Sequence, residues 1–314
     1  SRALKLFGLS SEKWNANVQA LSGSPANLAV YLALVPIGGK IMGMSLPHGG
    51  HLTHGQKVSI TGKAWQQIPY GVDQKTEVIN YEEIKSLAIQ EKPALIVCGY
   101  TAYPRIVDFK KFREIADACG AILMVDMSHF AGLVAGKQYP SPFEYADVVT
   151  TTVHKTLRGP RSAVIFSKKD EREFYKKIDK AVFPGLQGGP HINQIAAVAV
   201  ALKEADTPNF KKYAKQVKLN AKAISDELSR LGWRIISGGT DSHMVIMDTW
   251  RDGKGWSGED ASKKLEENGI IVNKNTIPGE TRSPMDPSGI RIGTAAETTR
   301  GKKEKDMKKI AERI

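Results

Sequence analysis

Short apolar segments alternate with amphipathic helical segments through the first half of this chain, and this pattern limits the folds it can adopt. Apolar runs of strand length occupy residues 40–44, 94–98, 121–125 and 147–152. Nearly continuous runs of this kind are typical of strands that are covered on both faces. Residues 81–90 and 109–119 carry apolar side chains at three- and four-residue spacing, and Gly120 follows as a helix C-cap. The alternation predicts an α/β fold with a mostly parallel central sheet flanked by helices.

A different pattern begins near residue 207. Before it, residues 187–205 are rich in alanine and valine and predict a buried helix. After it we expect a long amphipathic helix at 209–231 that Gly232 ends, strands at 233–236, 244–248, 270–273 and 289–293, and a helix at 258–268. The chain therefore predicts a large domain over residues 1–206 and a smaller C-terminal α+β domain over residues 207–314.

Composition excludes several classes of protein. The chain is 41% hydrophobic and 25% charged, which is typical of a globular protein, and no apolar run approaches the ~20 residues needed to span a bilayer. We therefore expect no membrane association. The two cysteines, Cys98 and Cys119, are too few for a disulfide scaffold and favour a reducing compartment. We expect a cytoplasmic protein, although the sequence does not exclude an organellar form.

The formal net charge of +12 has several interpretations. A basic protein can bind nucleic acid, or it can attract small anionic substrates. The lysines are mostly scattered along helical faces, as at Lys211, Lys212 and Lys215, and are not gathered in one stripe. This distribution favours a solvated helical surface, so we do not expect nucleic-acid binding.

Catalytic side chains in an open parallel sheet lie beyond the carboxyl ends of the strands. The strand expected at 147–152 is followed by Val153, His154 and Lys155 and then by Leu157-Arg158-Gly159-Pro160. A lysine here can form a Schiff base with an aldehyde cofactor if it is partly desolvated and lies near cationic groups. The alternative is an exposed lysine in a loop, which the threonine run and the adjacent histidine make less favourable.

Asp126 ends the neighbouring apolar strand in the sequence Met-Val-Asp-Met-Ser-His. A carboxylate in this position can hold the pyridine nitrogen of a cofactor protonated, so that the ring accepts electrons. It precedes Lys155 by 155 − 126 = 29 residues, which leaves room for one helix and the next strand. A helix N-cap, provided by Asp126 or Ser128, is an equally good interpretation of this residue alone.

Three further segments carry candidate site residues. The turn Ser22-Gly23-Ser24 opens an Ala/Leu-rich helix after a strand-like segment at 17–19, and its free N–H groups suit a phosphate, although an ordinary helix start is the simpler interpretation. Residues 48–55, HGGHLTHG, contain three histidines that favour stacking on an aromatic cofactor over metal binding. Arg291 lies on the strand expected at 289–293 and can bind a carboxylate, unless it is a surface arginine on an edge strand.

Together these motifs closely resemble serine hydroxymethyltransferase, one of the aspartate-aminotransferase-like (fold type I) pyridoxal-phosphate enzymes. The resemblance covers essentially the whole chain. Its most specific segments are HGGHLTHG (48–55), TTTVHKTLRGPR (150–161), VFPGLQGGP (182–190), VNKN (272–275) and SGIRIGT (288–294).

The resemblance implies a role for each matching residue. Lys155 would form the Schiff base with pyridoxal 5′-phosphate, with Asp126 at the pyridine nitrogen, His129 near the phenolic oxygen and His51 stacked on the ring. The remaining implied cofactor and catalytic residues are Ser22, Gly23, Ser24, Thr101, Thr152, His154 and, from a neighbouring subunit, Gly189. The implied substrate residues are Arg291 for the amino-acid carboxylate, Arg161 in support, and Leu46, Gly50, Leu52 and Asn275 for the folate.

The implied reaction is the reversible transfer of the serine hydroxymethyl carbon to tetrahydrofolate, giving glycine and 5,10-methylenetetrahydrofolate. The family forms homodimers or dimers of dimers with shared sites. Two alternatives stay open: another fold type I enzyme such as a threonine aldolase or aminotransferase, or a truncated non-catalytic paralogue. Against the family pattern, Val153 replaces a threonine, Thr101 a serine and Ala295 a proline. The chain also starts later and ends earlier than that pattern, so we expect it to lack some of the family's catalytic groups.

Overall fold

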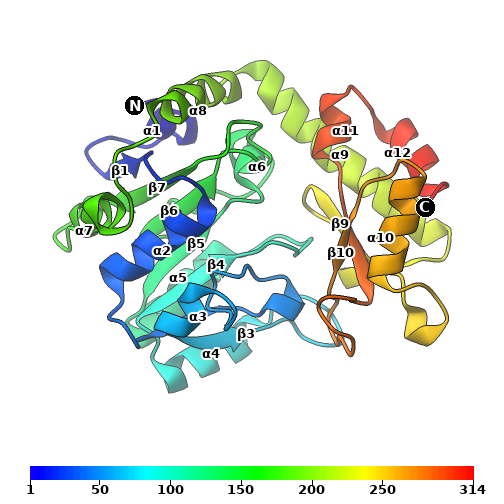
Figure 1. The fold of residues 1–314 in the computed structure, drawn as a ribbon, viewed down its shortest axis with the longest axis horizontal. Helices are drawn as coiled ribbons and strands as arrows, with labels where there is room; N and C mark the ends of the chain where they lie inside the picture. Colours follow the sequence, from blue (N-terminus) through cyan, green and yellow to red (C-terminus); the bar gives the residue numbers. More distant parts are fainter.

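The computed structural model of residues 1–314 is built around a seven-stranded sheet with the strand order β1-β7-β6-β5-β4-β2-β3 (Figure 1). The strands are β1 (Trp14–Asn17), β2 (Lys40–Met44), β3 (Gln66–Tyr70), β4 (Leu95–Gly99), β5 (Ile122–Asp126), β6 (Val148–Thr152) and β7 (Ala163–Lys168). The neighbouring strands β3, β2, β4, β5 and β6 run parallel. At the other edge β7 pairs antiparallel with β6, and β1 pairs antiparallel with β7. The predicted α/β class with a mostly parallel sheet is confirmed.

Helices cover both faces of this sheet because successive side chains of each strand point to opposite sides. On one face, Ile41, Leu95 and Val97 pack with α2 (Gly23–Leu34) and α7 (Phe174–Lys180). The alternate side chains of the same strands, such as Met42 and Ile96, pack on the other face against a second set of helices. That set comprises α1 (Arg2–Phe7), α4 (Tyr81–Glu91), α5 (Phe109–Cys119), α6 (Ala131–Ala135) and α8 (Ile192–Ala205). Short α3 (Ile60–Ala64) precedes β3.

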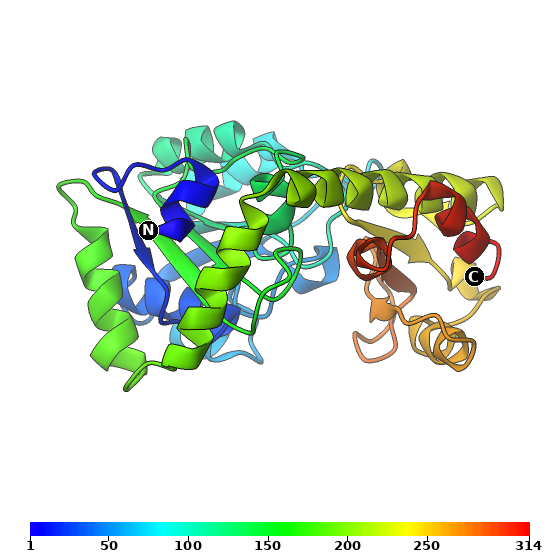
Figure 2. The same cartoon turned by 90° about the horizontal axis from the view of Figure 1, so that it is seen from above.

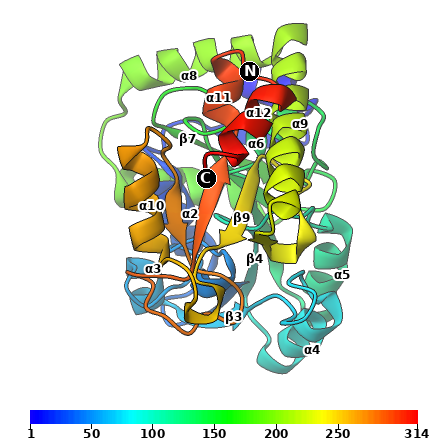
Figure 3. The same cartoon turned by 90° about the vertical axis from the view of Figure 1, so that its right-hand side faces the viewer.

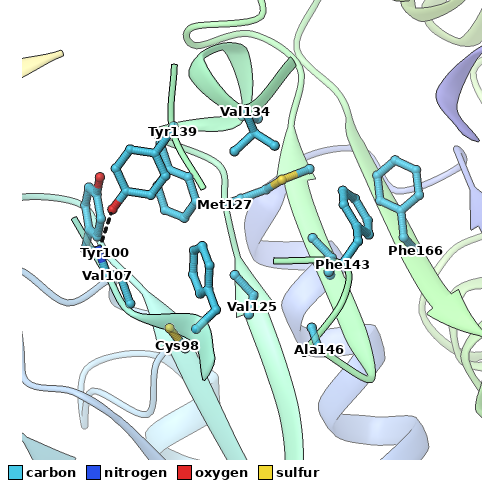
Figure 4. Close-up of a cluster of buried hydrophobic side chains, with 14 of the residues drawn as sticks. Cys98, Tyr100, Val107, Val125, Met127, Val134, Tyr139, Phe143, Ala146 and Phe166 are labelled. Atoms are coloured by element: carbon cyan, nitrogen blue, oxygen red, sulfur yellow. Dashed lines mark hydrogen bonds between the residues drawn. The ribbon is translucent and has the colours of Figure 1, made fainter. Parts of the chain in front are cut away.

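Aromatic rings fill much of the second face (Figure 4). The Tyr139 ring stacks on Phe130 with 4.6 Å between centroids, and Phe130 in turn contacts Tyr100 at 5.0 Å. The Tyr139 hydroxyl accepts a hydrogen bond of 2.9 Å from the backbone N–H of Val107, so its polar end is satisfied in the core. Tyr100 directly follows β4, and this aromatic stack therefore ties the end of that strand to the body of the core.

A second sheet of four antiparallel strands, β10-β11-β9-β8, lies beside the first (Figures 2 and 3). Its strands are β8 (Arg234–Ile235), β9 (Met244–Asp248), β10 (Asn273–Asn275) and β11 (Gly289–Gly293). The 23-residue helix α9 (Pro208–Arg230) runs toward it from the region of α8 (Figure 2). The other helices here are α10 (Gly258–Glu267), α11 (Ala295–Thr299) and α12 (Glu304–Ala311). None of the helices is long and apolar enough to cross a membrane.

The two faces of the second sheet have different partners. Val245 and Met247 of β9, with Ile290 of β11, pack against α9, α10 and α12. Ile246, between the first two, packs instead against Ala102 of the large sheet's β4 loop. One face of the small sheet is therefore turned toward the carboxyl ends of the large one, and Arg291, which pairs with Ile246, lies on that side.

Most predicted elements lie within two residues of their observed limits, but three begin three residues or more away from the prediction. Helix α8 begins at Ile192 and not at residue 187, because Gly188, Gly189 and Pro190 interrupt the segment before it. Strand β10 lies at Asn273–Asn275 and not at 270–273, since its pairing with β11 sets its limits. The first strand lies at Trp14–Asn17 and not at 17–19, paired with β7.

Candidate active site

A polar cavity of about 350 Å³ opens at the carboxyl ends of β4, β5 and β6. Its volume lies within the range of small-molecule sites. Thirteen residues line it: Ser22, Gly23, Ser24, His51, Tyr100, Thr101, Asp126, Ser128, His129, Thr152, His154, Lys155 and Arg161. The cavity therefore brings together most of the residues that the sequence nominated, from segments that are far apart along the chain.

Asp126 ends β5 with its carboxylate buried at the base of the cavity. Its Oδ2 accepts a hydrogen bond of 2.8 Å from Asn27 Nδ2 and lies 3.3 Å from His54 Nε2, while Oδ1 accepts from the backbone N–H of Ser128 at 3.1 Å. Burial raises the pKa of this carboxyl, but the hydrogen bond and charge of His54 outweigh it, so the pKa is lowered overall and Asp126 is ionised. Helix α6 has Phe130 at its N-cap, so Asp126 does not cap it.

Lys155 follows β6 and its ammonium group faces the cavity with no hydrogen bond or ion pair. Burial lowers the pKa of Lys155, the charge of Asp126 raises it, and Arg291 and Arg161 lower it further, with a net decrease. A lysine with a lowered pKa has a larger neutral fraction, which is the form that attacks a carbonyl. The alternative of a fully exposed loop lysine does not describe this side chain.

The turn Ser22-Gly23-Ser24 opens α2 at the rim of the cavity. Ser22 is the N-cap residue, yet its side chain makes no capping hydrogen bond, and both serines line the cavity. The first N–H groups of a helix have no partner within it and favour an anion. A Cβ on Gly23 would approach Thr152 Cγ2 to 2.8 Å, so the close approach of the turn to β6 requires glycine here. The turn thus offers free hydroxyl and N–H groups for a phosphate.

The histidines of residues 48–55 have three different partners and do not converge. His48 Nδ1 accepts from the backbone N–H of Val72 at 3.2 Å, and His54 lies against Asp126. His51 Nδ1 lies 2.7 Å from the hydroxyl of Thr53, and its ring lines the cavity. Burial and the neighbouring His54 lower the pKa of His51 to about 4, so its ring is neutral near pH 7. A neutral flat ring at this place suits stacking on an aromatic ligand.

Arg291 reaches the site from the second sheet. It lies on β11, which has β10 and β9 on its two sides, so the alternative of an edge strand is wrong. Its guanidinium donates to the backbone carbonyl of Thr101 at 2.8 Å and to Asn273 Oδ1 at 3.0 Å. Arg291 does not line the cavity itself, but its bond to Thr101, a lining residue, sets it beside the cavity. Its charge contributes to lowering the pKa of His129 and of Lys155.

Besides Arg291, five of the nominated residues lie outside the cavity lining: Leu46, Gly50, Leu52, Gly189 and Asn275. Thr276, which follows Asn275, donates a long hydrogen bond of 3.5 Å to the carbonyl of Leu46, so these two segments meet. A Cβ on Gly50 would approach the Met44 carbonyl oxygen to 1.9 Å, and this close backbone contact excludes any other residue there. Gly189 is exposed in the segment before α8.

Sequence reasoning missed several residues of the site. Asn27 joins Asp126 to Thr150, whose hydroxyl donates to Asn27 Oδ1 at 2.7 Å. His54 was part of a recognised motif without an assigned role, and Tyr100 and Ser128 also line the cavity. An asparagine on the buried side of an Ala/Leu helix is a signal that could have found Asn27, because buried polar groups need partners.

The lining chemistry fits pyridoxal phosphate. A free lysine, an ionised carboxylate and a helix N-terminus share one cavity, and each matches a different group of that cofactor. Three of the lining residues have a buried side-chain atom with no hydrogen-bond partner in the protein: Tyr100 Oη, Thr101 Oγ1 and His154 Nδ1. Unpartnered polar atoms at the wall of a polar cavity indicate a ligand that completes their hydrogen bonding.

Comparison with known proteins gives a single consistent result. The family model described as serine hydroxymethyltransferase matches residues 1–314. A curated protein named serine hydroxymethyltransferase, from Desulfotalea psychrophila, is 54% identical over 306 residues, which cover 98% of this chain and 70% of the relative. Neither match favours a threonine aldolase, an aminotransferase or a non-catalytic paralogue.

Proposed function

The chain belongs to the serine hydroxymethyltransferase family, and we propose that the cavity at the carboxyl ends of β4, β5 and β6 is its active site. The reaction of this enzyme moves the hydroxymethyl carbon of serine reversibly to tetrahydrofolate and gives glycine and 5,10-methylenetetrahydrofolate. One observation carries the assignment of the site: Lys155 and the ionised, hydrogen-bonded Asp126 line the same buried cavity.

The cofactor is pyridoxal 5′-phosphate, held by the residues that line the cavity. Bound there, it supplies an electron sink for the charge that develops when a bond to the amino acid's α-carbon breaks. Asp126 would hold the pyridine nitrogen protonated, because its own lowered pKa leaves the carboxylate ionised. Ser22, Gly23 and Ser24 bind the phosphate through hydroxyl and N–H groups. Lys155 is the attachment point.

The remaining lining residues orient the ligands. His51, neutral and flat, would pack on the face of the cofactor ring, and His129 would bind its phenolic oxygen. Thr101 offers a hydroxyl with no partner within the protein, and the Thr152 hydroxyl, which also lines the cavity, makes only a long bond of 3.4 Å to the Ser128 carbonyl. His154, whose Nδ1 is also unpartnered, lies beside Lys155.

Arg291 binds the carboxylate of serine or glycine. Only two hydrogen bonds from its guanidinium are used within the protein, to Thr101 and Asn273, and a guanidinium has five N–H donors. The remaining donors suit a bidentate contact with a carboxylate. Arg161 lines the cavity as a second cation and supports this end of the site.

Tetrahydrofolate contacts the segments around Leu46, Gly50, Leu52 and Asn275. These segments are brought together by the Thr276 contact with the Leu46 carbonyl, and Leu52 keeps 45% of its surface exposed. A flat pterin ring needs apolar surface of this kind at the mouth of a polar site.

The protein acts as a homo-oligomer in which Gly189 completes the partner's phosphate site. Apolar side chains with large exposed fractions line a hollow that shares Ser24 with the cavity, among them Val58 at 74%, Ile60 at 55% and Leu52 at 45%. Clustered apolar side chains of this size mark protein interfaces. Sedimentation velocity of the cofactor-loaded protein should show a dimer or larger species, and a monomer at all concentrations would contradict this part of the proposal.

The decisive test is a titration of the protein with pyridoxal phosphate, followed by visible absorbance. We expect a saturable band that Lys155→Ala abolishes and that Lys211→Ala, at an exposed lysine of α9, leaves unchanged. Serine and tetrahydrofolate should then yield methylenetetrahydrofolate with the wild-type protein and not with Lys155→Ala. A band that survives in Lys155→Ala would remove Lys155 from its role. Serine cleavage without tetrahydrofolate would favour an aldolase instead.

A further inference from the structure

A second buried histidine, His243, stacks on His129 behind the cavity. The ring centroids lie 5.9 Å apart with 26° between the ring planes. His129 lines the cavity, whereas His243 does not. The two rings come from different sheets, because His129 follows β5 of the large sheet and His243 directly precedes β9 of the small one.

Hydrogen bonds do not fix the orientation of the His129 ring. The only hydrogen bond that this residue makes through its own polar groups is at its backbone carbonyl, which accepts from the Thr156 hydroxyl at 3.0 Å. The ring therefore depends on packing for its orientation, and the stacked face of His243 supplies it. Aromatic pairs of this kind have preferred geometries and favourable energies beyond the area they bury.

His243 is itself held firmly on the small sheet. Its backbone carbonyl accepts from the N–H of Thr294 at 3.1 Å and from the Thr294 hydroxyl at 3.3 Å. Thr294 follows β11, the strand that carries Arg291. The same segment pair thus positions the His243 ring against His129 and the Arg291 guanidinium against the loop after β4.

The imidazole nitrogens of His243 contribute nothing to this arrangement. The Nδ1 atom is buried and has no partner. Burial, together with the charges of Arg291 and Lys155, lowers the pKa of His243 to about 3, so the ring is neutral. Burial also lowers the pKa of His129 well below its usual range. Two neutral rings can stack without charge repulsion.

We propose that His243 is a positioning residue that holds the ring of His129 in place for the cofactor by stacking. It is not a catalytic residue, because it does not reach the cavity. The proposal rests on the proposed function, since it assumes that pyridoxal phosphate occupies the cavity. The proposal predicts that the flat ring of His243 is needed to hold His129 in place and that its ring nitrogens are not.

Three variants separate ring shape from polarity and from volume. His243→Phe keeps a flat ring without nitrogens. His243→Asn keeps a polar group of similar size and loses the ring, and His243→Leu fills the space without a flat face. Val245→Ala is the matched control, because Val245 is fully buried on the opposite face of β9 and its loss destabilises the small sheet without touching the stack.

The measurements are the Kd for pyridoxal phosphate, the wavelength of the bound cofactor's visible band, and the melting temperature. We expect His243→Phe to stay within about twofold of the wild-type Kd with an unchanged band. His243→Asn and His243→Leu should bind about fivefold more weakly, as the loss of an aromatic pair implies, with a shifted band. Val245→Ala should melt earlier and bind normally.

The outcomes are distinct. If His243→Leu, or a folded His243→Asn, binds with the wild-type Kd and band, the positioning role is wrong. If His243→Phe is as weak as His243→Leu, the ring nitrogens matter and the stacking argument is wrong. If the wild-type protein itself shows no band that depends on Lys155, the proposed function fails and this inference fails with it.

Discussion

His54 Nε2 lies 3.3 Å from Asp126 Oδ2, and both side chains are buried. The same carboxylate oxygen accepts a 2.8 Å hydrogen bond from Asn27. A buried carboxylate is costly unless it is paired and hydrogen-bonded. Asp126 therefore stays ionised because Asn27 and His54, which lie far before it in the chain, both contact its carboxylate.

Replacing His54 should weaken the cofactor site. In His54→Leu, Asp126 loses a partner, its pKa rises, and it holds the pyridine nitrogen less well. A hydrogen bond to a charged group contributes about 1.5–3 kcal/mol, so we expect pyridoxal phosphate to bind roughly tenfold or more weakly by absorbance titration. His54→Gln keeps a donor and should lose less. Equal losses in the two variants would show that the hydrogen bond is not the reason.

The rate at which the cofactor attaches to Lys155 should depend on pH, and Arg161 should set the pH range in which it rises. The neutral amine of Lys155 is the reactive form, and its lowered pKa makes that form available at lower pH than for an exposed lysine. Arg161→Gln removes a cation that lowers this pKa, so the pKa rises. The rate of band formation plotted against pH should move to higher pH in Arg161→Gln. Arg300→Gln, at the exposed arginine that directly follows α11, serves as the control. A shift in the opposite direction would contradict the electrostatic account.

Sequence reasoning worked best where local pattern decides structure. The strands at 40–44, 244–248 and 289–293 and the helix at 109–119 have the predicted bounds, because apolar periodicity and end signals agree there. It was weaker where pairing or topology decides. The limits of β10 follow from its partner β11, and no local signal marks them.

The same distinction applies to the site. Lys155 and Asp126 could be nominated because each follows an apolar strand, and all such strand ends meet at one edge of a parallel sheet. The contact of Asn27 with Asp126 spans 99 residues and arises only when α2 packs across β6. The stack of His243 on His129 likewise needs the second sheet to be placed beside the first.

Asp147 should be a major contributor to stability away from the site. Its buried carboxylate accepts hydrogen bonds from Arg113 at 2.9 Å, from Arg172 at 2.7 Å and from the Leu123 N–H at 2.9 Å. Asp147→Asn should lower the free energy of unfolding by about 2 kcal/mol at pH 7, as expected for charge-assisted hydrogen bonds. Urea unfolding, followed by circular dichroism, would measure this. Asp170→Asn, at a half-buried partner of Arg172, should cost less than about 1 kcal/mol.

The pH dependence of this contribution has a defined sign. Burial raises the pKa of Asp147, but the Leu123 N–H and the two arginines lower it more, so the folded-state pKa lies below the unfolded one. The stabilisation is therefore complete above the unfolded pKa of about 3.9 and is lost as the pH falls through the folded value. The difference between wild type and Asp147→Asn should shrink on acidification. A constant difference from pH 7 to pH 3 would contradict the linkage.

The contact between Gly23 and Thr152 offers a test of the phosphate-binding turn by compensation. A Cβ at position 23 would approach Thr152 Cγ2 to 2.8 Å but would lie 3.7 Å from Ser128 Oγ, so a single methyl group is the obstacle. Gly23→Ala should displace the turn, as overpacking of about 1–3 kcal/mol does, and weaken pyridoxal phosphate binding about tenfold. Thr152→Ser removes that methyl group and keeps the hydroxyl, so alone it should change the Kd by less than about threefold. The double variant should recover most of the lost affinity. If the two effects simply add, the clash is not the cause and the turn has another reason to require glycine.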